Sequence, residues 1–442
     1  MPLLKYDRES VKIKNQFGLL KTKRFLPLFA TQFLGAFNDN LFKNALVILI
    51  TFRLADEYGV NAQILITIVA GLFILPFFLF SATAGQIADK YEKSFLIHII
   101  KFVEIILMVL TAISFYYTNL WALIILLFFM GAQSTFFGPL KFSILPQHLE
   151  ENELVAGNGL ISAGTYVAIL TGTLSGGLFI LHDMGRIYIS IGIISVAILG
   201  YIASLFIPKA DPKSSNITVD WNILRATYSL IKYVKPNKVL IKSILGISWF
   251  WFLGAVFLAQ FPTYTKDVLG GNEEISTFFL VVFSVGVGIG STLCNRLLSG
   301  KVSGKLIPFA CIGLSASTLL LYSFSKIFEK SNILINFLAF IKEPTSWGIT
   351  IGLLFLAIFG GIFSVPMYAI MQAESSSEHR ARVVATLNVF DSFGMVLSAL
   401  FVALMLMLKI SIINIFLIMG IINLLITPLL RKLGKTENDN RK

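Results

Sequence analysis

The chain of 442 residues is very apolar: 56% of its residues are hydrophobic, only 14% are charged, and its mean hydropathy is +0.80. Soluble domains carry about 25% charged residues, so this composition excludes a soluble globular protein. We expect the net charge of +12 to face an anionic membrane surface and not nucleic acid. Two cysteines, Cys294 and Cys311, lie in apolar runs and indicate neither a disulfide framework nor a metal site, and no cofactor is expected.

Membrane-spanning helices need about 20 mainly apolar residues each. Twelve segments meet this requirement, and the start of the chain shows no cleavable signal peptide. The segments are 25–52, 64–84, 95–115, 120–145, 159–181, 187–207, 239–265, 275–298, 306–325, 348–373, 385–408 and 412–430. The sequence therefore predicts an all-α polytopic membrane protein with twelve transmembrane helices.

One long polar segment divides these spans into two sets of six. We expect a short interfacial helix between Trp221 and Val234, where apolar residues recur at helical spacing. The predicted units are an N-terminal segment 1–24, a six-helix half 25–207, a linker 208–238, a second half 239–432 and a tail 433–442.

The distribution of Lys and Arg predicts the orientation. With the N-terminus inside, 25 of these residues fall in cytoplasmic segments, 7 in loops on the other side and 4 in helices or at their ends. Because basic residues accumulate on the cytoplasmic side, we expect both termini in the cytoplasm.

The first span contains a polar cluster that includes Asn38, Asp39, Asn40 and Lys43. Counted from Phe25, Asp39 lies about 20 Å into the helix, where a charge needs a partner or a cavity. Asp39 and Lys43 share a helix face and could neutralise each other as a purely structural pair. The neighbouring Asn residues favour the alternative, a site for an ionic or zwitterionic head group.

Four more polar residues are candidates for substrate binding: Lys141, Gln260, Tyr368 and Gln372. Lys141 lies near the predicted end of helix 4, so its ammonium could instead extend to the interface. Gln260 precedes Pro262, which frees backbone acceptors inside the span.

Asp391 is a second acid within a span. It and Asp39 are the candidate coupling residues, and helix packing is the alternative role for Asp391. His98, Lys101 and Glu104 follow one another along helix 3, and we interpret them as a structural, self-neutralised face near the cytoplasmic side.

The predicted loop between helices 2 and 3 resembles the G-x-x-x-D-[RK]-x-x-[KR] signature of the major facilitator superfamily, whose two six-helix halves match the predicted layout. Gly85 would allow close helix approach, and Asp89 would accept hydrogen bonds from the start of a neighbouring helix. Lys90 and Lys93 would pair across a cytoplasmic gate, and Arg382 is a further gating candidate. Such contacts would hold one access state and break in the other.

Enzyme motifs are missing from the sequence. It contains no phosphate-binding G-x-x-x-x-G-K-[ST] loop, no H-x-x-x-x-D acyltransferase motif and no nucleophile elbow. We therefore expect a protein that is not an enzyme.

Several stretches in both halves resemble the lysophospholipid transporters of the major facilitator superfamily, in particular the transporter half of fusions with acyltransferase and acyl-carrier-protein synthetase domains. They are QFLGAFNDNLFKNAL (32–46), FFGPLKFSILPQHL (136–149), GNGLISAGTYVAILTGTLSGG (157–177), FLAQFPTYT (257–265), GGIFSVPMYAIMQ (360–372) and HRARVVATLN (379–388).

This resemblance implies inward movement of lysophospholipids, such as lysophosphatidylethanolamine, across the bacterial inner membrane for reacylation. It implies that Asp39 and Lys141 contact the head group. Stand-alone members often have Arg where this chain has Gln260, which leaves a basic contact there in doubt. The expected partners are the substrate, membrane lipids and, if one exists, a separate acyltransferase or acyl-ACP synthetase, with the carrier acting as a monomer.

Two other functions remain open on the sequence. One is a proton- or sodium-coupled carrier of small polar solutes or drugs, in which Asp39 and Asp391 titrate. The other is a membrane scaffold or sensor without transport, which the gate-like segment disfavours.

Overall fold

The computed structural model describes residues 16–54, 57–60, 62–212, 217–330, 334–430 and 433. Within them, twelve helices are long and apolar enough to cross a membrane. The first six are α1 (Leu26–Leu49), α3 (Ala62–Lys90), α4 (Lys93–Tyr116), α5 (Leu120–His148), α6 (Leu154–Ile180) and α7 (Gly185–Leu205). The second six are α9 (Lys238–Thr263), α10 (Glu273–Leu298), α11 (Ile307–Ile327), α13 (Pro344–Glu374), α14 (Arg380–Met407) and α15 (Ile412–Leu430).

Shorter elements connect the spans. The π-helical turns η2 (Ile50–Leu54) and η4 (Tyr264–Val268) continue α1 and α9, and the 3-10 turns are η1 (Gln16–Lys21) and η3 (Glu151–Glu153). The linker contains α8 (Ile223–Val234), and the loop after α11 contains α12 (Phe337–Lys342). The predicted tails lie largely outside the described residues.

Each predicted span has its helix, but several boundaries moved, among them that of α14, which begins at Arg380 and not at residue 385. Helix α3 continues to Lys90, so Gly85–Lys90 forms its last turns. The sequence had suggested a loop there. Helix α5 continues through Pro146 to His148, which places Lys141 two turns inside the helix. Helix α6 begins at Leu154, five residues before the predicted start. Apolar content marks only the lipid-exposed length of a helix, so polar end turns were missed.

The turn between α3 and α4 shows how a helix start is encoded. The Glu92 carboxylate accepts hydrogen bonds from the backbone N–H groups of Ser94 (2.9 Å) and Phe95 (2.6 Å), which have no partner within the helix. It also accepts from the backbone of Ala210 (2.7 Å) in the linker. Partial burial raises the pKa of Glu92, but these hydrogen bonds outweigh it and the net pKa is lowered.

Glycines spaced four residues apart allow the closest helix packing in both halves. A Cβ atom on Gly176 of α6 would lie 2.6 Å from the carbonyl oxygen of Leu41 in α1, and one on Gly172 would meet that of Phe37. In the second half, a Cβ on Gly290 of α10 would meet the α13 backbone. Small residues allow helix backbones to approach inside a membrane, where dispersion contacts hold helices together.

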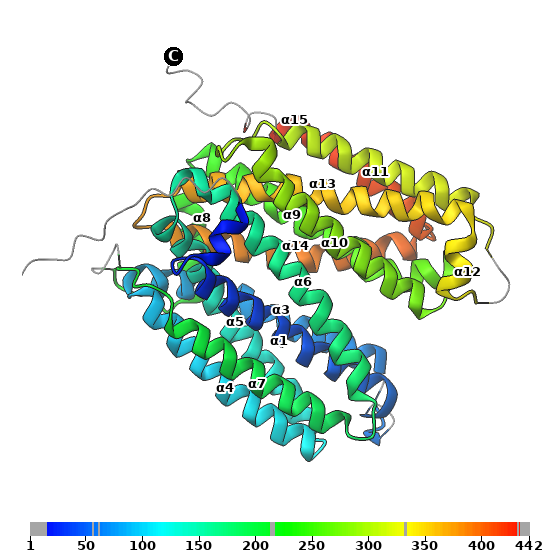
Figure 1. Cartoon of the computed structure of the whole chain (residues 1–442), viewed down its shortest axis with the longest axis horizontal. Helices are drawn as coiled ribbons and strands as arrows, with labels where there is room; N and C mark the ends of the chain where they lie inside the picture. The colour runs from blue at the N-terminus through cyan, green and yellow to red at the C-terminus, as the bar shows by residue number, and fades with distance from the viewer. Residues whose placement is uncertain are drawn as a thin grey trace, which may run out of the picture.

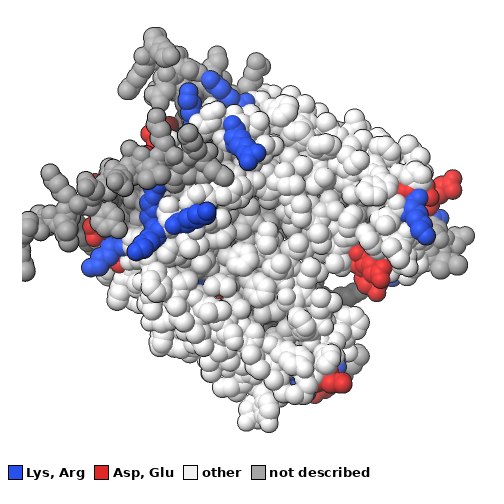
Figure 2. All heavy atoms as spheres, in the orientation of Figure 1, with Lys and Arg blue, Asp and Glu red and all other residues white. Residues whose placement is uncertain are grey.

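The two halves meet at one end of the molecule. Figure 1 shows them converging at the end where α8 lies and diverging toward the end where α12 lies. Contacts between halves are made mainly by α6 with α10 and by α3 with α14. In Figure 2, Lys and Arg gather at the α8 end, few charges appear along the middle, and a notch separates the halves at the opposite end.

Candidate functional site

At the α8 end, three layers of contacts join the halves, and the first layer is centred on Asp89. Its fully buried carboxylate accepts hydrogen bonds from the backbone N–H groups of Ala381 (3.0 Å) and Arg382 (3.2 Å) in the first turn of α14. The Arg382 guanidinium donates to the same carboxylate at 3.1 Å. A Cβ on Gly85, one turn earlier, would lie 2.5 Å from the Cβ of Ala385, so the two helices touch here. An anion at a helix N-terminus is stabilised by the N–H groups and the helix dipole.

 The two lysines of the signature differ in their surroundings. The Lys90 ammonium lies over the ring of Tyr91, 5.5 Å from the ring centroid. Lys90 therefore contacts an aromatic ring of its own half, and its pairing across the gate stays a prediction. Lys93 is buried, 1% exposed, close enough to Asp89 to interact with it electrostatically, and its backbone N–H donates to Ala210 in the linker at 3.2 Å. Across the junction, the Asp89 carboxylate pairs with the Arg382 guanidinium.

His379 precedes α14 beside this junction. Its ring stacks on Tyr233 of α8 with the centroids 4.4 Å apart and the planes 5° from parallel. Burial and the nearby Arg382 guanidinium lower the pKa of His379, against an opposing effect of Glu378. A charged imidazolium is therefore disfavoured at this position.

A second layer is formed by a pair of amides. Asn158 of α6 donates to the side-chain oxygen of Gln372 at 2.6 Å, and Gln372 of α13 donates back to Asn158 at 3.0 Å. Both side chains are fully buried. In this state Gln372, which the sequence suggested as a substrate contact, instead joins the halves, and Asn158 is a partner that sequence reasoning did not assign.

Aromatic stacking forms the third layer. The rings of Phe142 in α5 and Tyr368 in α13 lie 4.8 Å apart and 13° from parallel. Tyr166 of α6 stacks on Trp251 of α9 at 6.2 Å. The indole N–H of Trp251 donates to the Tyr368 hydroxyl at 3.0 Å, which connects the two stacks. Tyr368 is thus placed at the junction of the halves.

Beyond these layers, charged side chains lie partly exposed within the spans of the first half. The Asp39 carboxylate accepts a hydrogen bond from the Ser134 hydroxyl at 2.7 Å, and the Lys43 ammonium donates to Asn40 at 3.0 Å. Asp39 and Lys43, which the sequence allowed as a structural pair, interact electrostatically but each makes its hydrogen bond with another residue. Lys141 lies over the ring of Phe142 at 4.8 Å and interacts electrostatically with Asp39. This group of Asp39, Lys43 and Lys141 is called the polar chamber below.

A buried ion pair supports the polar chamber from behind. Lys101 and Glu104 of α4 are 2.6 Å apart with side chains 1% and 2% exposed. Glu104 also accepts hydrogen bonds from Asn38 and from Gln133, both at 3.0 Å. Asn38 is fully buried in this contact, so the structure places it behind the chamber and not among its exposed residues.

His98 does not join this ion pair. Its ring nitrogen lies 2.9 Å from the carbonyl oxygen of Ser204 in α7. Two of the three residues in the predicted face therefore neutralise each other, and the third connects helices.

The second half contributes Asp391 of α14. Its carboxylate accepts a hydrogen bond from the Ser248 hydroxyl of α9 at 2.5 Å and interacts electrostatically with Tyr368. Gln260, also on α9, is 9% exposed, one turn before the helix continues into η4. Asp391 therefore lies near the aromatic layer, and a role of Gln260 in substrate binding stays a prediction.

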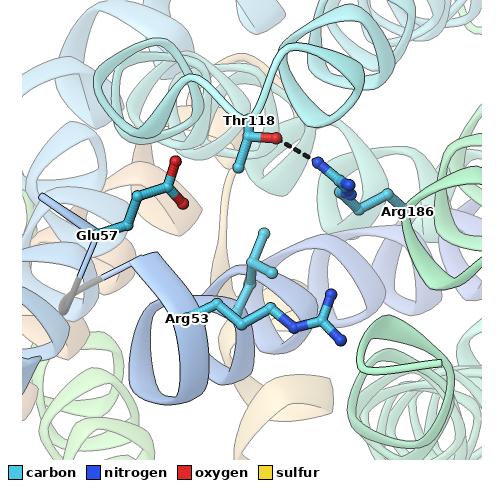
Figure 3. Close-up of a pocket in the computed structure, with 5 residues that line it drawn as sticks. Arg53, Glu57, Thr118 and Arg186 are labelled. Carbon is cyan, nitrogen blue, oxygen red and sulfur yellow. Dashed lines mark hydrogen bonds between the residues drawn. The ribbon is translucent and has the colours of Figure 1, made fainter. Parts of the chain in front are cut away.

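A separate cavity of about 250 Å³ lies at the far end of the first half and is lined by Leu49, Arg53, Glu57, Thr118 and Arg186 (Figure 3). Arg53 donates to the carbonyl oxygen of Leu181 at 3.0 Å, and Arg186 donates to the Thr118 hydroxyl. These contacts tie loops together at the tip of one half, away from the polar chamber. In the described residues, no group of three His, Cys, Asp or Glu side chains could hold a metal ion.

The sequence profile of the Major Facilitator Superfamily matches residues 28–355. The chain is 26% identical to the lysophospholipid transporter LplT of Photorhabdus laumondii over 80% of its own length and 81% of that protein. It is 23% identical to LplT of Cronobacter sakazakii over 86% and 88%, respectively.

Among solved structures, the transporter FucP in its outward conformation superimposes with a TM-score of 0.70 at 15% identity, covering 93% of this chain and 99% of FucP. The human organic anion transporter MFSD10 superimposes with a TM-score of 0.72 at 13% identity, covering 92% and 99%. The twelve spans in two halves, the Asp89 junction and the match over residues 28–355 lead to one conclusion: the chain belongs to the major facilitator superfamily.

Proposed function

We propose that this protein is a secondary transporter that moves lysophospholipids across the bacterial inner membrane by alternating access. The observation that carries the proposal is the polar chamber, which places one carboxylate and two ammonium groups, all partly exposed, inside the spans. Charges at this depth are costly unless they serve a substrate or a partner. The similarity to proteins named lysophospholipid transporters supports this choice of substrate.

The chamber offers complementary charges to a zwitterionic head group. In our proposal, Lys141, with Lys43 beside it, binds the phosphate, and Asp39 binds the ammonium of an ethanolamine group. Hydrogen bonds between charged partners are about twice as strong as neutral ones, and more so away from water. The acyl chain would remain against apolar surface or lipid.

The closed layers give the proposal its gating step. Asp89 with Arg382 and Asn158 with Gln372 would separate when the α8 end opens, while the opposite end closes by rocking of the halves. We also propose that both termini are cytoplasmic, because Lys and Arg accumulate in the segments at that end. The present structure is then closed toward the cytoplasm, and the carrier would act as a monomer that supplies a separate acyltransferase.

Uptake by proteoliposomes tests the site. Asp39→Asn should reduce uptake of lysophosphatidylethanolamine more than uptake of lysophosphatidylglycerol, which has no ammonium, and Lys141→Gln should reduce both. Losing one charged hydrogen bond costs about 1.5–3 kcal/mol, which corresponds to roughly ten- to hundredfold in affinity. Asp220→Asn, at the surface of the linker, is the control. Unchanged uptake in both chamber variants would show that the head group binds elsewhere.

Asp391 favours a second candidate, a carrier of small polar solutes coupled to protons. Its contact with Ser248 and its position near Tyr368 give a carboxylic acid at the junction of the halves, where a proton could couple to opening. Under this alternative, transport requires a pH gradient and is abolished by Asp391→Asn, and lysophospholipid is not taken up. Uptake of lysophospholipid without an ion gradient would favour the first proposal.

A further inference from the structure

Helix α8 contacts both halves of the transporter. Ala226 and Leu230 of α8 pack in one cluster with Ala82 of α3 and Ala385 of α14. These are the two helices that Asp89 joins. The backbone N–H of Asp220, just before α8, donates to the side chain of Gln86 in α3 at 2.7 Å.

The other end of α8 contacts the second half. Tyr233 stacks on His379, and its hydroxyl lies 3.3 Å from the Ser376 hydroxyl. These contacts along its length therefore hold α8 against α3 and α14, close to the ends of these two helices.

The remaining surface of α8 is divided into an apolar and a basic side. At about 100° per residue, Leu224 and Tyr228 lie roughly 160–200° around the helix from the buried Ala226. They are 78% and 68% exposed, and Trp221, which precedes the helix, is 74% exposed. Arg225 and Ser229, both exposed, lie roughly 260–300° around.

The neighbouring surface of α14 indicates what covers the apolar side. Exposed apolar residues on the side of α14 away from Asp391 begin at Phe393, which is 53% exposed, and continue through Leu397 and Leu400. Phe393 follows Ala385, the contact with α8, by eight residues, or about 12 Å along the helix. The exposed side of α8 therefore lies near the level at which the apolar surface of α14 ends and its polar end begins.

We infer that α8 docks on the phospholipid bilayer surface, with Trp221, Leu224 and Tyr228 inserted at the level of the head groups. Trp and Tyr are favoured at this depth. The exposed lysines Lys232 and Lys235 match the negative charge of an anionic leaflet, whereas Arg225 on the same side is paired with Asp220 at 2.5 Å. Because α8 packs on both α3 and α14, the bilayer holds a helix that bridges the closed junction.

Spin labels on adjacent residues test this inference in the full-length protein. In a Cys294→Ser, Cys311→Ser background, Tyr228→Cys and Ser229→Cys are labelled with a nitroxide and reconstituted in liposomes that contain anionic lipid. Collisions with oxygen, which is enriched in the bilayer, are compared with collisions with a water-soluble nickel chelate. We expect the label at 228 to favour oxygen and the label at 229 to favour nickel.

A second pair keeps the test decisive if one variant does not fold. Leu224→Cys should behave like Tyr228→Cys, and Arg225→Cys should behave like Ser229→Cys. Equal nickel accessibility at 224 and 228 and at their neighbours would place the apolar side in water and overturn the inference. Protection of 224 and 228 from both reagents would show that protein covers this side, which also overturns it.

Discussion

Replacing Glu104 by Gln should be among the most destabilising single changes in the first half. The substitution keeps the size of the side chain but removes the charge that balances Lys101, 2.6 Å away and 1% exposed. Removing one partner of a buried ion pair costs about 3–5 kcal/mol, because the other charge stays buried without compensation. In Glu104→Gln, the lysine would retain the ring of Phe137, 5.2 Å from its ammonium.

The reverse change should cost less. In Lys101→Met, the Glu104 carboxylate keeps the hydrogen bonds donated by Asn38 and Gln133, both at 3.0 Å. The double variant Lys101→Met, Glu104→Gln buries no net charge and should recover most of the loss, since replacing both members of a buried pair is often close to neutral.

Unfolding by SDS in mixed micelles, followed by tryptophan fluorescence, measures these free energies. The expected order of stability is wild type, then the double variant, then Lys101→Met, and last Glu104→Gln. A Glu104→Gln protein as stable as the wild type would refute the reasoning, as would a double variant no more stable than Glu104→Gln. Either result would mean that Lys101 does not carry an uncompensated charge in the variant.

Three further predictions concern the junction and the packing. Asp89→Asn should weaken the contact with the start of α14, so hydrogen–deuterium exchange of a peptide containing Arg382 should speed up while peptides from α15 stay unchanged. Gly176→Val should cost about 1–3 kcal/mol by overpacking α1 against α6, whereas Gly254→Val, with nothing within 4 Å of its Cβ, should be tolerated in the same SDS titration. The pKa of His379 is lowered in the folded protein, so its contribution to stability should be present above the ordinary pKa of about 6.5 and be lost as pH falls below it. The variant His379→Gln should remove this part of the difference in the free energy of unfolding between about pH 7.5 and about pH 5.5. An unchanged difference would contradict the assignment.

Local sequence was sufficient for the spans and for parts of the junction. A helix satisfies its backbone hydrogen bonds within one segment, so an apolar stretch of sufficient length predicts a span wherever it occurs in the chain. The short helix in the linker was foreseeable because apolar residues recur at helical spacing between Trp221 and Val234. The pattern around Gly85 and Asp89 pointed to close helix approach and to a carboxylate at a helix start, and both features are present.

The partners of the polar residues were decided by the tertiary structure. Asp39 and Lys43 are one turn apart and were an obvious pair, yet Asp39 bonds Ser134, which is 95 residues away. Gln372 meets Asn158 across 214 residues and between the two halves. Pairing at such separations depends on how the helices pack, which helical periodicity does not encode. The sequence by itself therefore determined the number and charge bias of the helices, whereas packing alone decided which polar groups face the chamber, which lie behind it and which hold the halves together.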